Sequence, residues 1–175
     1  KQRKVIYGER DNVLKGVDLR ETIMQMAKDT VIESVEKYID VKPRNYFKYF
    51  NSLYSAFMPD GTLLMPDIAN MTRDEVIDNT MEIVKRVYEL KMMMVPDYEL
   101  AQQEKDILLE VVDTYWVDHI DLMDQMRQSV GLVSVAQKDP VKEYTIEGYK
   151  MFESLNRKIR RETLKFVFTF DEEDE

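Results

Sequence analysis

The stretch DYELAQQEKDILLEVVDTYWVDHIDLMDQMRQSV, residues 97–130, carries one apolar face along its whole length. Its large side chains recur at steps of three and four residues, which is the period of an α-helix. Pro96 stands directly before it and marks where this element begins. The pattern predicts one long helix over about 97–130, with its apolar face formed by Leu100, Ile107, Leu108, Val111, Val112, Tyr115, His119, Leu122, Met123, Met126 and Val130.

A second long helix follows after a short connection at about 131–138. Asp139 and Pro140 are the residue types that favour an N-cap and a first helical position. The short connection predicts that the two helices lie antiparallel, as an αα-hairpin over 97–167. The buried face of the second helix is expected to comprise Val141, Tyr144, Gly148, Phe152, Leu155 and Ile159.

The rest of the chain also shows helical patterns. Residues 1–15 are expected to form a helix that Gly16 ends, and the start without methionine favours a piece of a longer protein. Asp18 with Glu21, and Thr72 with Glu75, have the spacing of capping boxes at two further helix starts. An aromatic-rich segment at 44–58 suits a short helix between them. We therefore predict an all-α fold.

The composition excludes several classes of protein. Hydrophobic residues make up 44% and charged residues 34% of the chain, which is too apolar for disorder and too charged for a membrane protein. The net charge of −9 argues against nucleic acid as a partner, because phosphate binding needs a basic surface. There are no cysteines, so disulfides and thiolate zinc sites are excluded.

Motifs for catalysis are absent or weak. No glycine-rich phosphate-binding loop of the G-x-x-x-x-G-K-[ST] type occurs, so this chain is not expected to hold a nucleoside triphosphate. Asp118, His119, Asp121 and Asp124 resemble a metal-ligand cluster, but helical spacing puts His119 on a different side from Asp121 and Asp124. We expect no catalytic residue, metal or cofactor within the chain; an all-α enzyme using Asp118 and His119 stays an alternative.

Two apolar stretches could serve as binding surfaces. Met92 to Met94 could form an adaptable groove, although packing at the helix end is the favoured interpretation. The connection at 131–138 has Val133 and Val135 among small residues, and an isolated hairpin has no need of an apolar tip. A stand-alone helical adaptor that binds partner helices through these surfaces is therefore a second hypothesis.

Two blocks of sequence resemble the SecA family. The first begins at Trp116 and continues through His119, Met123, Asp124 and Arg127, and the second runs from Ala136 through Asp139, Pro140 and Tyr144 to Gly148 and Phe152. The family pattern is W-x-x-H-L-x-x-M-D-x-L-R, then x-Q-x-D-P-x-x-E-Y. The resemblance covers about 1–40 and 97–155 strongly, and 44–95 only in position and helical character.

The resemblance implies an organisation and a function. By similarity, 1–16 is the end of a long scaffold helix, 17–96 a helical wing, 97–167 a two-helix finger of the scaffold and 168–175 an acidic tail. SecA proteins are cytoplasmic ATPases at the inner face of the bacterial plasma membrane. They dock on the SecY channel and move unfolded preproteins, while ATP and Mg²⁺ bind in motor domains outside this chain.

The same resemblance assigns contact with SecY and preprotein to the fingertip loop. Its residues here are Leu132, Val133, Ser134, Val135, Ala136, Gln137 and Lys138. The family usually has L-R-G-Y before x-Q-x-D-P, so Val133, Ser134 and Val135 replace arginine, glycine and tyrosine. We expect a smaller apolar contact without a hydroxyl, and a divergent or accessory SecA parent.

The remaining motif residues are expected to play structural roles. Trp116 is a large anchor, and Tyr144 belongs to the apolar face. Gly148 is expected to allow close helix packing, and Arg127 to bond loop carbonyls, a motor-domain carboxylate or a neighbour on the finger.

Overall fold

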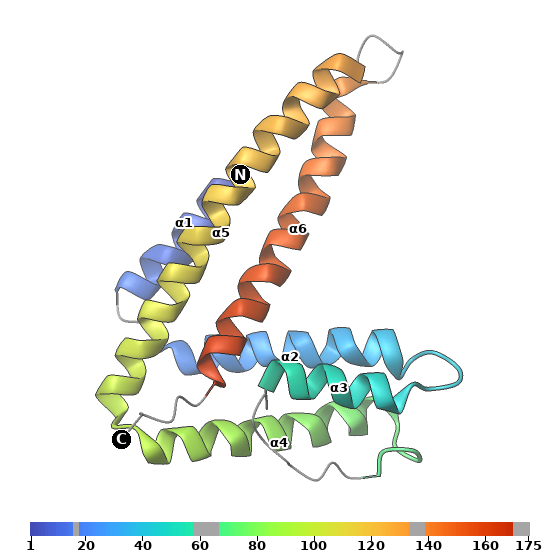
Figure 1. Cartoon of the computed structure of the whole chain (residues 1–175), viewed down its shortest axis with the longest axis vertical. Coiled ribbons are helices and arrows are strands. Elements are labelled where there is room, and N and C mark those ends of the chain that lie inside the picture. The colour runs from blue at the N-terminus through green and yellow to red at the C-terminus, as the bar shows by residue number, and fades with distance from the viewer. Residues whose placement is uncertain (16–17, 58–66, 134–138, 170–175) are drawn as a thin grey trace.

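The computed structural model describes residues 1–15, 18–57, 67–133 and 139–169. Over these residues the chain is all-α, as predicted (Figure 1). The helices are α1 (Gln2–Leu14), α2 (Leu19–Tyr38), α3 (Tyr46–Phe57), α4 (Arg73–Met94), α5 (Asp97–Val133) and α6 (Pro140–Val167).

Helices α5 and α6 form the predicted antiparallel hairpin. It extends from the rest of the molecule as a long arm, and α1 lies beside the middle of α5 (Figure 1). Helix α1 runs opposite to α5, because Gln2 contacts His119 while Arg10 pairs with Asp113 further down the arm. Beyond Gln2, α5 and α6 have only each other as neighbours among the described helices.

Helices α2, α3 and α4 pack together across the base of the hairpin (Figure 1), and we call this group of helices the wing. Their starts follow local capping chemistry. The Asp18 side chain accepts from the backbone amide of Arg20, and the Thr72 hydroxyl accepts from that of Glu75. Thr72 thus caps the third helical residue, as a capping box requires, whereas Asp18 caps the second.

The wing core is built from aromatic and branched side chains. Tyr49, Leu53 and Phe57 of α3 are buried in the core that α3 shares with its neighbours α2 and α6. The Tyr49 hydroxyl lies 2.6 Å from the Thr80 hydroxyl, which satisfies both polar groups inside the core. Burial raises the pKa of Tyr49 to about 12, so this group stays neutral.

The end of α6 joins the wing to the hairpin. Phe168, the first residue of the predicted tail, is 1% exposed and packs edge-on against Phe57 at 5.2 Å. Lys91 of α4 donates to the Val167 carbonyl at the end of α6. The Tyr88 hydroxyl donates to Glu104 of α5 at 2.5 Å. Helices of the wing and of the hairpin therefore share one hydrophobic core.

Two expectations from the sequence differ from the structure. Met93 and Met94 are 83% and 72% exposed, so they do not pack as favoured. They lie in the last turn of α4, where the chain turns into α5 and no further element covers them among the described residues. The helix α5 also continues to Val133, past the predicted end near residue 130.

Candidate functional site

The hairpin beyond α1 is the candidate functional site. We call it the distal hairpin, residues 120–133 and 139–147. Asp139 caps the returning helix: its side chain accepts from the backbone amides of Val141 at 3.1 Å and Lys142 at 3.4 Å. Pro140 is the first residue of α6. Both predictions for Asp139 and Pro140 are confirmed.

The predicted fingertip loop is only partly described. Leu132 and Val133 form the last turn of α5 rather than a loop, because Gly131 is accommodated in the helix. The Leu132 side chain is 78% exposed. The other predicted contact residues lie outside the described part of the chain; they are Ser134, Val135, Ala136, Gln137 and Lys138.

Apolar side chains on the distal hairpin face solvent. The sequence placed Leu122 and Val141 on buried faces, but they are 43% and 72% exposed. Two helices alone can bury only one narrow stripe of side chains between them. On α5 this stripe consists of the half-buried Met123, Met126 and Val130. The exposed large apolar residues of the distal hairpin are Ile120, Leu122, Leu132, Val141 and Ile146.

A hydrogen-bonded joint marks where the distal hairpin begins. We call Gln2, His119 and Gly148 the joint. The Gln2 amide donates from Nε2 to the Gly148 carbonyl at 3.0 Å. Its Oε1 lies 2.9 Å from His119 Nε2. One side chain of α1 therefore connects α5 and α6.

The joint fixes the tautomer of His119. A carbonyl can only accept, so the Gln2 nitrogen must face Gly148 and its oxygen must face His119. His119 therefore carries its proton on Nε2. The ring is 4% exposed and lies between the rings of Trp116 at 5.5 Å and Phe152 at 6.2 Å. This burial lowers the pKa of His119 and favours the neutral ring.

The predicted structural residues gather around the joint. A Cβ built on Gly148 would lie 3.2 Å from Met123 Cε, so the glycine does allow close packing of α5 and α6. Trp116 is buried and meets Tyr7 of α1 edge-on at 6.1 Å. Tyr144 is half-buried, which fits its expected place on the inner face of α6.

Two motif residues point elsewhere. Asp124 and Arg127 are exposed, and no hydrogen bond or ion pair joins either to another described residue. The predicted bond from Arg127 to the loop concerns residues outside the described part. Both side chains are left available on the surface of the distal hairpin.

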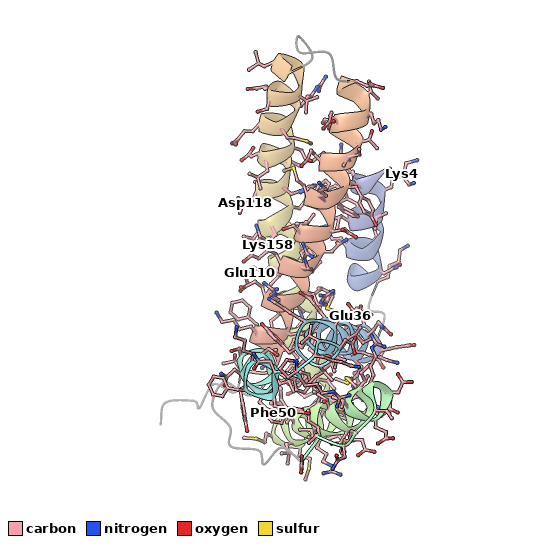
Figure 2. All side chains as sticks on the ribbon, turned by 90° about the vertical axis from the view of Figure 1, so that its right-hand side faces the viewer. Lys4, Glu36, Phe50, Glu110, Asp118 and Lys158 are labelled. Carbon is pink, nitrogen blue, oxygen red and sulfur yellow. The ribbon has the colours of Figure 1, made fainter. Side chains whose placement is uncertain are left out.

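The alternative of a metal-dependent site at Asp118 and His119 gains no geometric support. His119 turns toward Gln2, while Asp118 points outward on the side away from Lys4 of α1 (Figure 2). No group of three or more potential acidic or histidine ligands gathers within the ranges that the structure describes.

In those same ranges, no helix combines the length and hydropathy needed to cross a bilayer.

Sequence reasoning missed Gln2. It treated residues 1–15 as a helix without an N-terminal cap and assigned no role to Gln2. The signal was present, because Gln2, Ile6 and Arg10 recur every four residues and so share one face. All three face the hairpin: Ile6 is 1% exposed, and Arg10 makes a two-pronged ion pair with Asp113.

The fold and the joint together define an all-helical scaffold, in which a wing holds the base of a long hairpin. The family model for the SecA Wing and Scaffold domain matches residues 1–171. The chain belongs to the SecA family and corresponds to its wing and scaffold.

Individual relatives agree with this assignment. Protein translocase subunit SecA 2 of Clostridioides difficile (strain 630) is 51% identical over 170 residues, which cover 97% of this chain and 22% of that protein. SecA 1 of the same organism is 38% identical over 168 residues, covering 96% and 19%. Protein translocase subunit SecA of Finegoldia magna is 38% identical over 169 residues, covering 95% and 19%. The chain spans about a fifth of the length of these relatives.

Proposed function

We propose that this chain is the wing and scaffold of a protein-translocating ATPase of the SecA type. In this proposal the wing and scaffold form part of a clamp around an unfolded preprotein. The hairpin serves as a two-helix finger at the mouth of the SecY channel. ATP and Mg²⁺ bind in other domains of the parent protein, which works in the cytoplasm and peripherally at the bacterial plasma membrane.

The observation that carries the proposal is the distal hairpin. Its apolar side chains, including Leu132 at the end of α5, are exposed although nothing in the fold of this chain requires them there. Exposed apolar groups at the end of a projecting element are typical of contact surfaces. Such groups can contact many unfolded sequences, because apolar contact depends little on direction.

The residue types at the predicted fingertip favour an accessory SecA. Val133 and Val135 replace the larger arginine and tyrosine of the usual family pattern, so the tip is expected to offer less apolar area and no aromatic hydroxyl. The identity of 51% to SecA 2 against 38% to SecA 1 of one organism points the same way. We propose a parent with a narrower set of client proteins than a general SecA.

Site-specific photocrosslinking tests the finger. A photoreactive amino acid is placed at Leu132 in the intact protein, and a preprotein is stalled in the channel during ATP-driven transport. We expect crosslinks to the preprotein or to SecY. The matched control is the same label at Asp78, an exposed position on α4 of the wing.

The outcomes separate the finger from other roles. Crosslinks to SecY from Leu132 but not from Asp78 support the finger, because only the tip of the hairpin is proposed to lie at the channel mouth. Equal crosslinking of SecY from both positions, or no crosslink from Leu132 during active transport, contradicts it. Replacing Val133→Arg and Val135→Tyr together should then change the crosslinking yield, since these changes restore the usual family residues at the tip.

A further inference from the structure

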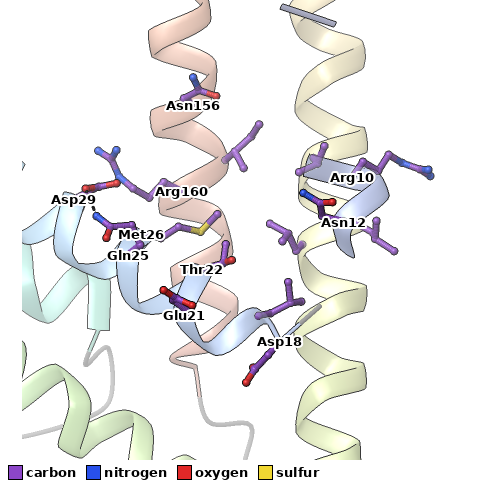
Figure 3. Close-up of a pocket in the computed structure, with 15 residues that line it drawn as sticks. Arg10, Asn12, Asp18, Glu21, Thr22, Gln25, Met26, Asp29, Asn156 and Arg160 are labelled. Atoms are coloured by element: carbon purple, nitrogen blue, oxygen red, sulfur yellow. Dashed lines mark hydrogen bonds between the residues drawn. The ribbon is translucent and has the colours of Figure 1, made fainter. Parts of the chain in front are cut away.

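A groove of about 720 Å³ lies at the base of the hairpin (Figure 3). Here α5 and α6 diverge, and the first half of α2 crosses between them (Figure 1). The end of α1 contributes Arg10 and Asn12 to one side. The groove is at the opposite end of the hairpin from Leu132, so it is separate from the proposed fingertip.

The inner wall of the groove is apolar. Leu108 and Val112 of α5 and Ile159 of α6 are each almost fully buried where they line it. Met26 of α2 extends into the space between the helices (Figure 3). A methionine side chain is flexible and polarisable, so it adapts to apolar groups of different shapes. The volume is in the range of sites that hold small ligands or a few side chains.

The rim carries amide and hydroxyl groups. Asn12, Gln25 and Asn156 come from three different helices, and Thr22 adds a hydroxyl (Figure 3). Side-chain amides offer both donors and acceptors, which are the groups that an extended peptide backbone needs. Asn12 and Asn156 are exposed, and no hydrogen bond joins their side chains to other described residues.

The positive charges on the rim are already paired. Arg10 binds both carboxylate oxygens of Asp113, at 2.8 and 3.1 Å. Arg160 donates to the Thr30 hydroxyl at 3.1 Å and to Glu33. Both guanidinium groups are therefore engaged by partners outside the groove.

The negative charges on the rim are not paired. Asp18, Glu21 and Asp29 all line the groove, and within the described residues none of them forms an ion pair. Asp18 caps α2, and Asp29 accepts from Gln25 at 2.9 Å, but neither bond neutralises a charge. Glu21 is exposed and has neither kind of partner. The groove thus offers an apolar wall and unneutralised carboxylates within one space.

We infer that this groove binds an extended polypeptide segment in which a lysine or arginine stands beside apolar residues. The apolar side chains lie against Met26 and the inner wall, the amides bond the peptide backbone, and the basic group meets Glu21 or Asp29. A segment with acidic residues at the same places is repelled by these carboxylates. The site is a second contact for an unfolded chain, and its binding does not depend on the fingertip.

Fluorescence anisotropy on the intact protein tests the inference. The probes are a short labelled peptide that alternates leucine with lysine and a matched peptide that alternates leucine with glutamate. We expect the lysine peptide to bind at least roughly tenfold more tightly, and its affinity to fall as salt is raised. Replacing Glu21→Gln and Asp29→Asn together keeps the side-chain sizes and is expected to lower its affinity about fivefold.

The matched control is Asp78→Asn with Glu82→Gln, which removes two exposed carboxylates from α4 on the wing. This control should bind the lysine peptide as the unchanged protein does, and circular dichroism should show equal folding of both variants. A photoreactive group at Thr22 should crosslink to the bound peptide. Equal binding of the two peptides, full affinity in the groove variant, or equal loss in the control would each overturn the inference. If the peptide-binding inference is refuted, the crosslink expected from Leu132 is unaffected. Each of the two proposals can therefore be refuted without the other.

Discussion

Gln2 connects three helices through one amide group. The Gly148 carbonyl sets the direction of that amide, and the amide in turn sets which nitrogen of His119 carries the proton. The surrounding rings of Trp116 and Phe152 make a second proton costly, because they replace water around the imidazole. Burial therefore favours the neutral form of His119 within the joint.

The joint predicts a dependence of stability on pH. Burial lowers the pKa of His119 in the folded chain, so the unfolded chain binds the proton more readily. As the pH falls below the ordinary histidine value of about 6.5, the free energy of unfolding should decrease until the lowered folded pKa is passed. Urea unfolding across this range measures the slope. His119→Gln, which can still donate to Gln2, should remove it.

A second titrating group must be separated from this effect. Burial raises the pKa of Glu104 above its ordinary value of 4.5, so protonation of Glu104 stabilises the fold as the pH falls. This trend is opposite in sign to that of His119 and is present in both proteins. The difference between the unchanged chain and His119→Gln therefore isolates the histidine. Identical pH profiles for the two would refute the account of the joint.

Gly148 gives a prediction graded by side-chain size. A new Cβ would meet the flexible end of Met123 at 3.2 Å, and alanine also favours the helix over glycine. Gly148→Ala should therefore change the free energy of unfolding by less than about 1 kcal/mol. Gly148→Leu should cost about 1–3 kcal/mol, because it forces α5 and α6 apart. Equal effects of the two changes in urea unfolding would show that the helices are not closely packed there.

Single residues were predictable where their role is local. Gly148 was expected to allow close helix packing, and a Cβ at this position would indeed lie 3.2 Å from Met123 Cε. Gln2 was not predictable in its role, because its partners lie more than a hundred residues away in sequence. The groove at the base depends likewise on four helices meeting, which no local pattern encodes.

At the scale of elements, helix starts were predicted better than helix ends. Thr72 and Asp139 act through bonds to amides two or three residues ahead, so sequence spacing alone identifies them. The end of α5 was predicted near residue 130, but the helix continues to Val133 and includes Gly131. A Cβ there would meet nothing within 4 Å, so neither packing nor a close approach requires the glycine to end the helix.

The cap at Asp139 can be tested as a property of the hairpin. Asp139→Ala removes the side-chain acceptor for the amides of Val141 and Lys142. The loss should destabilise the start of α6 by about 1 kcal/mol. Amide hydrogen exchange should rise in the first turns of α6 and stay unchanged in the wing. Asp106→Asn, on an exposed part of α5, serves as the matched control, and equal exchange in both variants would contradict a capping role.

At the scale of the whole molecule, the wing and the hairpin share buried polar groups. Tyr88 and Lys91 of α4 reach Glu104 of α5 and the Val167 carbonyl of α6. Glu104 and Lys91 are only 2% and 6% exposed. Charged groups buried this deeply are tolerated when they are paired, and they cost several kcal/mol when a partner is lost. The sequence predicted the two parts but not this contact, because it depends on how the helices cross.

This contact predicts that wing and hairpin unfold together. Tyr88→Phe removes the hydroxyl that donates to Glu104, and Glu104→Gln removes the charge that it meets. A hydrogen bond to a buried charged group contributes about 1.5–3 kcal/mol, so a double-mutant cycle should give a coupling energy in this range. The unfolding free energies come from urea titrations followed by circular dichroism.

The same variants test whether the Tyr88–Glu104 contact connects the wing to the hairpin or whether the two parts unfold independently. If the contact connects them, hydrogen exchange should rise in α4 and in the first turns of α5 in each single variant, since both helices lose the same anchor. Tyr98→Phe provides the control, because the Tyr98 hydroxyl also bonds a glutamate but on the surface, at 3.0 Å from Glu99. Water replaces that bond, so the control should change stability by less than about 0.5 kcal/mol. A coupling energy near zero, or faster exchange confined to α4, would mean that apolar packing around Phe168 alone holds the wing on the hairpin.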